Sequence, residues 1–248
     1  MIGALIIGDE ITRGRRQDKH FTKTIELLAA RGMHLDWAQY IGDDPALIVA
    51  TLQRTLASGD LVFSFGGIGS TPDDHTRRCA AEARGVPLKL HADAEAEIRA
   101  RFGAEITPQR QKMGEVPEGS RIIPNPYTRI PGFSVGDHHF VPGFPIMAWP
   151  MLEWVLDTHY AHLFNAVPEA YASVLVHGLA ESQITPLMLE VEAKYPGMKS
   201  FSLPTIAVDG TRGHIELGVR GAPGDVEPAM DILRKGVDAL GGRWEHRS

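Results

Sequence analysis

The chain has 248 residues, of which 43% are hydrophobic and 23% are charged, and its formal net charge is −6. This composition is that of an ordinary globular protein and excludes disordered and fibrous classes. The acidic balance argues against a general nucleic-acid binder, because such proteins neutralise many phosphates with clustered lysine and arginine.

The single cysteine, Cys79, excludes an internal disulfide framework and cannot by itself form a thiolate metal site. We expect it to be a small apolar residue on a helix. The segment from Ile2 to Ile7 is apolar, but it lacks a basic region and meets Asp9 and Glu10 at once, so it is not expected to be a signal peptide. No stretch approaches the ~18 unbroken apolar residues of a membrane span. We therefore expect a cytoplasmic protein with no membrane and no nucleic-acid partner.

Short apolar runs alternate with helical periods in the first half of the chain. This alternation is typical of strands joined by crossover helices in a largely parallel sheet, and hence of an α/β fold. Up to the first glycine-rich loop, the pattern predicts strands over 4–7, 35–41 and 61–65, and helices over 18–32 and 44–59. Beyond the loop it predicts helices over 74–84, 93–102 and from 107, strands over 121–123 and on both sides of a 136–137 turn, and a helix reaching 164.

The pattern changes after Pro168. There it predicts, in order, a strand over 171–176, a helix over 182–194, strands over 201–208 and 214–219, and a helix over 226–240. The order β-α-β-β-α is typical of a small antiparallel sheet with helices on one face, an α+β lobe. We therefore expect two domains, residues 1–165 and 168–248.

The junction between the third strand and the next helix is a glycine-rich loop, GGIGSTPDDHT. Gly66, Gly67 and Gly69 lack Cβ atoms, so this backbone can adopt positive φ and approach a ligand with its N–H groups, while the following helix adds a positive dipole end. The spacing excludes a P-loop, which needs a lysine, and a dinucleotide fingerprint, which needs a small residue where Pro72 stands. The loop is interpreted as a binding site for phosphate or carboxylate; the alternative is a tight turn alone.

Acidic residues accompany this loop. Asp73 and Asp74 would repel a phosphate unless a divalent cation (Mg²⁺, Mn²⁺ or Co²⁺) or a hydroxyl-rich group lies between them, although Asp74 could instead cap the helix. Glu10 and Asp43 follow the first and second strands, and the carboxyl ends of parallel strands meet at one edge of a sheet. We expect these acids to face the same cleft, with solvated loop positions as the alternative.

The histidines are weaker candidates for a metal site. His138 and His139 are adjacent in a predicted strand and so point to opposite faces. His159 and His162 lie about one helical turn apart, but no third ligand accompanies them. We expect structural roles for both pairs.

Five ordered motifs resemble a known family: IIGDEITRGRRQDKH, IGDDPALI, GGIGSTPDDHT, IIPNPYTRIPGF and VPGFP. In this order and spacing they resemble the MoaB/Mog molybdopterin-binding fold and, within it, the amino-terminal domain of CinA-type proteins. The resemblance implies a three-layer α/β/α domain over residues 1–165 with a mostly parallel sheet, commonly assembled as a homo-oligomer, a dimer or trimer. The lobe over 168–248 more loosely resembles a short companion domain of some CinA-like proteins, and we expect no deamidase domain.

The resemblance also implies roles for individual residues. It assigns the phosphate cradle to Gly66, Gly67, Gly69, Ser70 and Thr71. It implies that Asp74, with Asp73, holds a catalytic metal and that Lys19 helps to hold a diphosphate. The remaining pocket positions that it implies are Glu10, Asp18, Asp43 and Asn125.

Three departures from the family pattern bear on function. Ser70 replaces a proline of the glycine loop, Met147 stands where a late motif has a glutamate, and Lys19-His20 replaces Thr-Asn. CinA-type members are associated with metal-dependent cleavage of nucleotide diphosphates such as ADP-ribose, and other members bind or adenylylate molybdopterin. The resemblance therefore implies a metal-dependent nucleotide pyrophosphatase; the alternatives are a molybdopterin-binding protein of cofactor biosynthesis and a non-catalytic ligand-binding protein.

Overall fold

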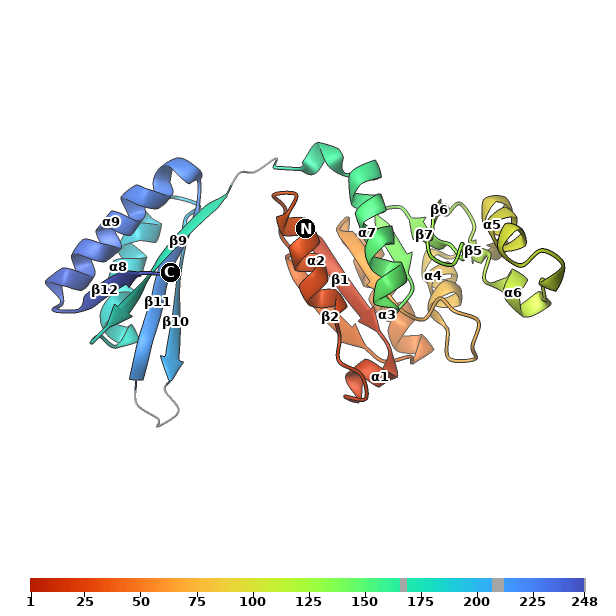
Figure 1. The fold of residues 1–248 in the computed structure, drawn as a ribbon, viewed down its shortest axis with the longest axis horizontal. Helices are drawn as coiled ribbons and strands as arrows, with labels where there is room; N and C mark the ends of the chain where they lie inside the picture. Colours follow the sequence, from red (N-terminus) through yellow and green to blue (C-terminus); the bar gives the residue numbers. More distant parts are fainter. Residues whose placement is uncertain (166–168, 207–211, 248) are drawn as a thin grey trace. The chain divides into compact units, whose positions relative to one another are not determined.

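The chain divides into two compact units, Met1–Ala166 and Val167–Ser248, in the computed structural model (Figure 1). The structure describes residues 1–165, 169–206 and 212–247. The predicted domain boundary between 165 and 168, and the end of the strand predicted over 201–208, lie partly outside these described residues. Each unit has its own sheet and its own hydrophobic core.

The first unit is built on a six-stranded sheet with the order β2-β1-β3-β8-β7-β6. The strands are β1 (Ile2–Ile7), β2 (Trp37–Ile41), β3 (Leu61–Phe65), β6 (Arg121–Ile123), β7 (Gly132–Val135) and β8 (His138–Val141). β1 pairs in parallel with β2 and β3, and β3 pairs in parallel with β8. β7 and β6 then continue the sheet in antiparallel fashion. β6 therefore runs in the same direction as β1, β2, β3 and β8, and the carboxyl ends of these five strands meet at one edge.

Helices cover both faces of this sheet. α2 (His20–Ala29) and α7 (Pro145–His159) pack on one face, where Leu28 and Leu152 belong to the same core cluster as Phe63 of β3. α3 (Pro45–Ser58) and α4 (Thr76–Arg84) pack on the other face in a second cluster. All five residues of β3 are buried, as expected for a strand with helices on both sides. The three-layer α/β/α architecture with a mostly parallel sheet is confirmed.

Smaller elements complete the first unit. They are α1 (Asp9–Thr12), α5 (Ala92–Phe102), η1 (Gly103–Glu105), α6 (Pro108–Lys112), η2 (Ala161–Leu163) and a separate two-stranded antiparallel sheet of β4 (Leu88–Leu90) and β5 (Glu115–Pro117). Cys79 lies fully buried on α4, the apolar helical position expected from the sequence.

The second unit is a four-stranded antiparallel sheet with two helices. Its elements are β9 (Ala170–His177), α8 (Glu181–Lys194), β10 (Lys199–Ile206), β11 (Arg212–Gly221), α9 (Pro223–Ala239) and β12 (Arg243–His246), with the strand order β10-β11-β9-β12. Both helices join the strands in one core cluster. The predicted β-α-β-β-α order is present, and β12 extends it by one strand. Within the described ranges, every helix is too short or too polar to span a bilayer.

Candidate functional site

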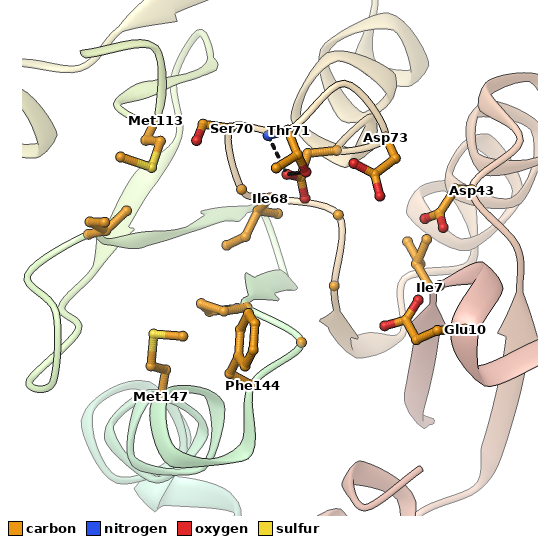
Figure 2. A pocket seen from close by; sticks show the side chains of 18 of the residues that line it. Ile7, Glu10, Asp43, Ile68, Ser70, Thr71, Asp73, Met113, Phe144 and Met147 are labelled. Atoms are coloured by element: carbon orange, nitrogen blue, oxygen red, sulfur yellow. Dashed lines mark hydrogen bonds between the residues drawn. The ribbon is translucent and has the colours of Figure 1, made fainter. Parts of the chain in front are cut away.

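A cavity of about 420 Å³ opens at the carboxyl edge of the parallel strands (Figure 2). Its walls come from the segments that follow β1, β2, β3 and β8, together with the loop after β6. This edge is where open α/β sheets bind ligands, and the volume lies within the range of small-molecule sites. Ten of the residues expected from the sequence line it: Glu10, Asp43, Gly66, Gly67, Gly69, Ser70, Thr71, Asp73, Asp74 and Asn125.

The glycine loop requires glycine at its first two positions. Gly66 and Gly67 have φ of 101° and 67°, in the region that side chains rarely adopt. A Cβ at Gly66 would overlap the carbonyl oxygen of Ile7, and a Cβ at Gly67 would overlap Oγ1 of Thr76. That hydroxyl donates to the carbonyl of Gly66 at 3.1 Å, and the Thr76 amide donates to the carbonyl of Gly67 at 3.0 Å. The loop is thus closely packed against the start of α4.

The N–H groups of this loop are available to a ligand. Within the described residues, the four consecutive amides from Gly67 to Ser70 donate to no protein acceptor. Arg77 donates from its guanidinium to the carbonyl oxygens of Ile68 and Gly69. Because a trans peptide points each C=O opposite to the next N–H, the amides of Gly69 and Ser70 are directed away from Arg77. Consecutive free amides of this kind can bind an anion, and we call these four the anion nest.

Arg77 is a functional candidate that the sequence analysis missed. Burial lowers the pKa of its guanidinium, while the charges of Asp74 and Glu115 act in the opposite direction. The side chain places positive charge directly behind the anion nest. Its position in the first turn of the helix that follows the loop was the signal that could have identified it.

Asp74 fixes the shape of the loop. Its Oδ2 accepts hydrogen bonds from the amide of Thr71 at 2.8 Å and from the Thr71 hydroxyl at 2.5 Å, shown dashed in part in Figure 2. A Cβ at Gly69 would overlap this carboxylate. The N-cap of α4 is His75, so Asp74 closes the turn that begins at Thr71 and does not cap the helix.

Asp73, Asp43 and Glu10 form an acidic wall on one side of the cavity (Figure 2). Burial raises the pKa of Asp43 first, and the negative charges of Asp9, Glu10 and Asp73 raise it further, although a hydrogen bond from the Asp9 amide at 2.8 Å opposes this. The nearby Thr71 hydroxyl, whose proton is donated to Asp74, lowers the pKa of the exposed Asp73. The repulsion felt by Asp43 shows that the acidic wall has an excess of negative charge.

A divalent cation fits this wall only together with oxygen atoms of a ligand. In the part of the chain that the structure describes, no group of three or more His, Cys, Asp and Glu side chains is arranged to hold a metal ion. Mg²⁺, however, is usually bound through one or two carboxylates plus substrate phosphates and water. Carboxylates and free backbone amides that line one cavity match that kind of site.

The opposite wall of the cavity is apolar. Met113, Met147, Phe144 and Ile68 face the cavity from this side (Figure 2). The Thr128 hydroxyl lies 3.6 Å from the sulfur of Met147. Thioether and aromatic side chains suit a flat heterocycle, because sulfur makes favourable contacts with ring edges. Met147 therefore supplies packing at the position where the family motif has a carboxylate.

Asn125 organises a loop rather than offering free polar atoms. Its amide nitrogen donates to the Thr128 hydroxyl at 2.8 Å and to the carbonyl of Ile130 at 2.9 Å. Its oxygen accepts from the amides of Tyr127 and Thr128 at 3.0 and 3.1 Å. All its hydrogen-bonding capacity is thus used within the loop that places Thr128 and Ile130 against the cavity.

Asp18 and Lys19 lie outside the cavity lining. Asp18 accepts from the amides of His20 and Phe21 at the start of α2 and from the Tyr40 hydroxyl at 2.8 Å. Burial, followed by this hydrogen bond, raises the pKa of Tyr40 to about 12. Lys19 is exposed at the N-cap of α2. The structure brings in other side chains that the sequence analysis did not name for the site, chiefly Arg16, Met113, Thr128 and Phe144.

Comparisons with known proteins agree with this fold. Residues 3–162 match the family model described as a probable molybdopterin binding domain. A CinA-like protein from an Anaeromyxobacter species is 30% identical over 241 residues, which are 89% of this chain and 59% of that protein. A second, from Syntrophotalea carbinolica, is 32% identical over 191 residues, covering 74% of this chain and 46% of the relative.

A solved structure is also similar. CinA from Thermoplasma acidophilum, described as having unknown function, is 31% identical with a TM-score of 0.58, and the match covers 63% of this chain and 96% of that one. The chain spans about half the length of the curated relatives that it matches. With the motifs, the three layers and the glycine-loop cavity all in place, the chain belongs to the molybdopterin-binding-domain family, as a CinA-type protein with the MoaB/Mog fold.

Proposed function

We propose that the cavity binds a nucleotide diphosphate of the ADP-ribose type together with a divalent cation, and that the protein hydrolyses the diphosphate bond. The observation that carries this proposal is that the free amides of Gly67–Ser70 and the carboxylates of Asp73, Asp43 and Glu10 line one cavity. A phosphate next to both walls requires a cation between it and the acids. The apolar wall beside them suits the heterocycle of a nucleotide.

Each wall has a separate task in this proposal. The free amides of the glycine loop hold one phosphate, and the charge of Arg77 behind them strengthens that interaction. Asp73 and Asp43 would hold Mg²⁺, Mn²⁺ or Co²⁺, while Asp74 maintains the shape of the loop. Such a cation would neutralise phosphate charge and make a bound water more acidic. Water adds to one phosphorus, the bridging P–O bond breaks, and ADP-ribose yields AMP and ribose 5-phosphate.

Two other functions use the same cavity. The family model, described as a probable molybdopterin binding domain, favours a pterin phosphate as ligand. Met147 favours a non-catalytic binding protein, because no carboxylate is present at that position to take a proton. A pterin phosphate and ADP-ribose each combine phosphate with a flat ring, so binding experiments must distinguish between them.

A turnover assay tests the proposal. ADP-ribose is incubated with the protein and Mn²⁺, and AMP is quantified by ion-exchange chromatography. We expect turnover that chelation abolishes, and an Asp73→Asn variant at least ~100-fold slower, as for loss of a metal ligand. Asp93→Asn, an exposed aspartate on α5, is the matched control and should behave as wild type.

Calorimetry decides among the remaining outcomes. Tighter binding of a pterin phosphate than of ADP-ribose would favour the molybdopterin function. Binding of ADP-ribose without turnover at any cation would favour the non-catalytic function. Turnover that persists in the presence of chelator would rule out a metal-binding role for the acidic wall.

A further inference from the structure

Arg16 is the one positively charged side chain among the described residues that line the cavity. The other charged side chains in the lining are the carboxylates of Glu10, Asp43, Asp73 and Asp74. The anion nest accommodates one phosphate. Apart from a bound cation, Arg16 is the positive charge among these lining side chains that a second anionic group could reach.

The backbone at Arg16 is held in place. Its amide donates to the carbonyl of Glu10 at 2.8 Å, which turns the chain back to the sheet edge after α1. Gly14, with φ of 70°, donates to the carbonyl of Ile11 at 3.0 Å and permits that reversal. Arg16 is therefore presented at the cavity by an ordered turn.

The side chain of Arg16 is only weakly engaged. Its guanidinium lies 3.8 Å from a carboxylate oxygen of Glu10 and 5.6 Å from the ring centroid of Phe144. The Arg16 side chain is 54% exposed, and ion pairs and cation–π contacts at exposed sites contribute little. Within the described part of the chain the guanidinium donates no hydrogen bond to a protein acceptor. Its donors can therefore turn to a ligand at small cost.

The neighbouring arginines are used differently. Arg13 pairs with Asp9 at 2.7 Å on α1, and Arg77 donates to the carbonyls of the glycine loop from behind. Arg15 is exposed and does not line the cavity. Arg16 alone of these combines a place in the lining with a guanidinium free to bind.

We propose that Arg16 is a specificity-determining residue that binds the second phosphate of a diphosphate ligand while the amides of Gly67–Ser70 bind the first. The planar guanidinium fork matches two phosphate oxygens, an interaction stronger than the exposed contacts with Glu10 and Phe144. Packing on the Phe144 ring keeps the fork at the mouth of the cavity. This inference rests on the proposed function and names what distinguishes a diphosphate from a monophosphate at the site.

Titration calorimetry with two probes tests the inference. AMP and α,β-methylene-ADP share the adenosine and the first phosphate, and the second carries an additional phosphate on a bond that water does not cleave. We expect Arg16→Gln to weaken α,β-methylene-ADP binding about tenfold, because one charge-assisted contact is lost. The same variant should weaken AMP binding by less than about twofold. Arg16→Lys keeps the charge but not the planar guanidinium, and its affinity for α,β-methylene-ADP should fall about threefold.

Arg15→Gln is the matched control, because it removes the same charge from the adjacent exposed position and should leave both affinities unchanged. Equal weakening of both probes by Arg16→Gln, or the same loss from Arg15→Gln, would show a general charge effect and overturn the inference. If Arg16→Gln leaves the ratio of the affinities for α,β-methylene-ADP and AMP unchanged, the inference about Arg16 is wrong and the proposed function still stands. Failure of the wild-type protein to bind either probe would overturn both.

Discussion

At Asp43 the arrangement that suits a cation also costs stability. Its pKa is raised by burial and by the charges of Asp9, Glu10 and Asp73. When the pKa of a carboxyl is higher in the folded than in the unfolded protein, the group stabilises the fold at a pH below its unfolded-state pKa. This stabilisation is lost as the pH rises through the folded-state pKa. At neutral pH the ionised Asp43 therefore opposes folding, and a bound cation would remove that opposition. Such costs are typical of binding sites.

Gly67 and Gly85 provide a matched test of the glycine loop. Both have φ of 67°, but a Cβ at Gly85 meets no atom within 4 Å, whereas a Cβ at Gly67 would overlap the Thr76 hydroxyl. Gly85→Ala should lower the free energy of unfolding by about 1–2 kcal/mol, the cost of the left-handed conformation. Gly67→Ala should cost at least about 1 kcal/mol more, because the Thr76 hydrogen bond to Gly66 must also break.

Urea unfolding of both variants measures this difference, and calorimetry with ADP-ribose and Mn²⁺ measures its effect on binding. Gly85→Ala should bind as wild type, while Gly67→Ala should lose binding because the anion nest is displaced. Equal stabilities of the two variants would contradict the close packing of the loop against α4.

Residue types and strand ends predicted much of the site. The glycine loop, Glu10, Asp43, Asp73 and Asp74 were placed at one sheet edge from the sequence, and all line the cavity. Arg16 and Arg77 were missed because their positions depend on the turn after α1 and on the carbonyl directions of the loop, which spacing does not reveal. Lys19 and Asp18 carried a motif match, but the first turn of α2 directs them elsewhere.

At the scale of elements, the long periodic segments were predicted best. The strands β1 and β3 and the helices α3, α8 and α9 lie within a few residues of their expected ranges. The 4-residue α1, the 3-residue strands β4 and β5, and β12 were not predicted. Such short elements carry too few residues for a period to show, and β12 is fixed by its pairing with β9 rather than by its own sequence.

Strand β8 carries two buried histidines that remain neutral. Burial lowers the pKa of His138 to about 4 and that of His139 to about 3. The Tyr160 hydroxyl donates to Asp137, so it accepts from Nε2 of His139, and Nδ1 of His139 in turn accepts from Ser134. This network requires the neutral imidazole. Nε2 of His138 has no partner within the described structure.

These histidines predict acid sensitivity with a defined window. In the folded protein their pKa values lie below the ordinary histidine value of 6.5. Their contribution to the stability of the fold is therefore fully present above pH 6.5 and is lost as the pH falls through the folded-state pKa values. Between about pH 6.5 and 4, each should lower the free energy of unfolding by about 1.4 kcal/mol per pH unit. His138→Leu should remove one such contribution. Urea unfolding at several pH values measures the slope.

The exposed His162 supplies the control for this experiment. His162→Leu should leave the slope unchanged. A His138→Leu protein whose stability falls with pH as steeply as wild type would show that His138 does not resist protonation in the folded state.

At the scale of the whole molecule, each unit has its own hydrophobic core. Leu152 lies in a core cluster built from the first unit alone, and Leu217 lies in the cluster of the second. The two-domain prediction rests on the change in pattern after Pro168, where strands joined by crossover helices give way to a short antiparallel order. Among the described residues, those that line the cavity belong to the first unit.

Calorimetric unfolding should therefore show two transitions, only one of which responds to ligand. At about 100 times its dissociation constant, ADP-ribose with Mn²⁺ should stabilise the first unit by about 2.7 kcal/mol and leave the second unchanged. Leu217→Ala, which truncates a fully buried side chain, should lower the stability of the second unit by about 2–5 kcal/mol without altering the ligand-induced shift. Leu152→Ala, equally buried, should destabilise the first unit instead. A single transition that Leu217→Ala and ligand both move would mean that the two cores unfold as one cooperative unit.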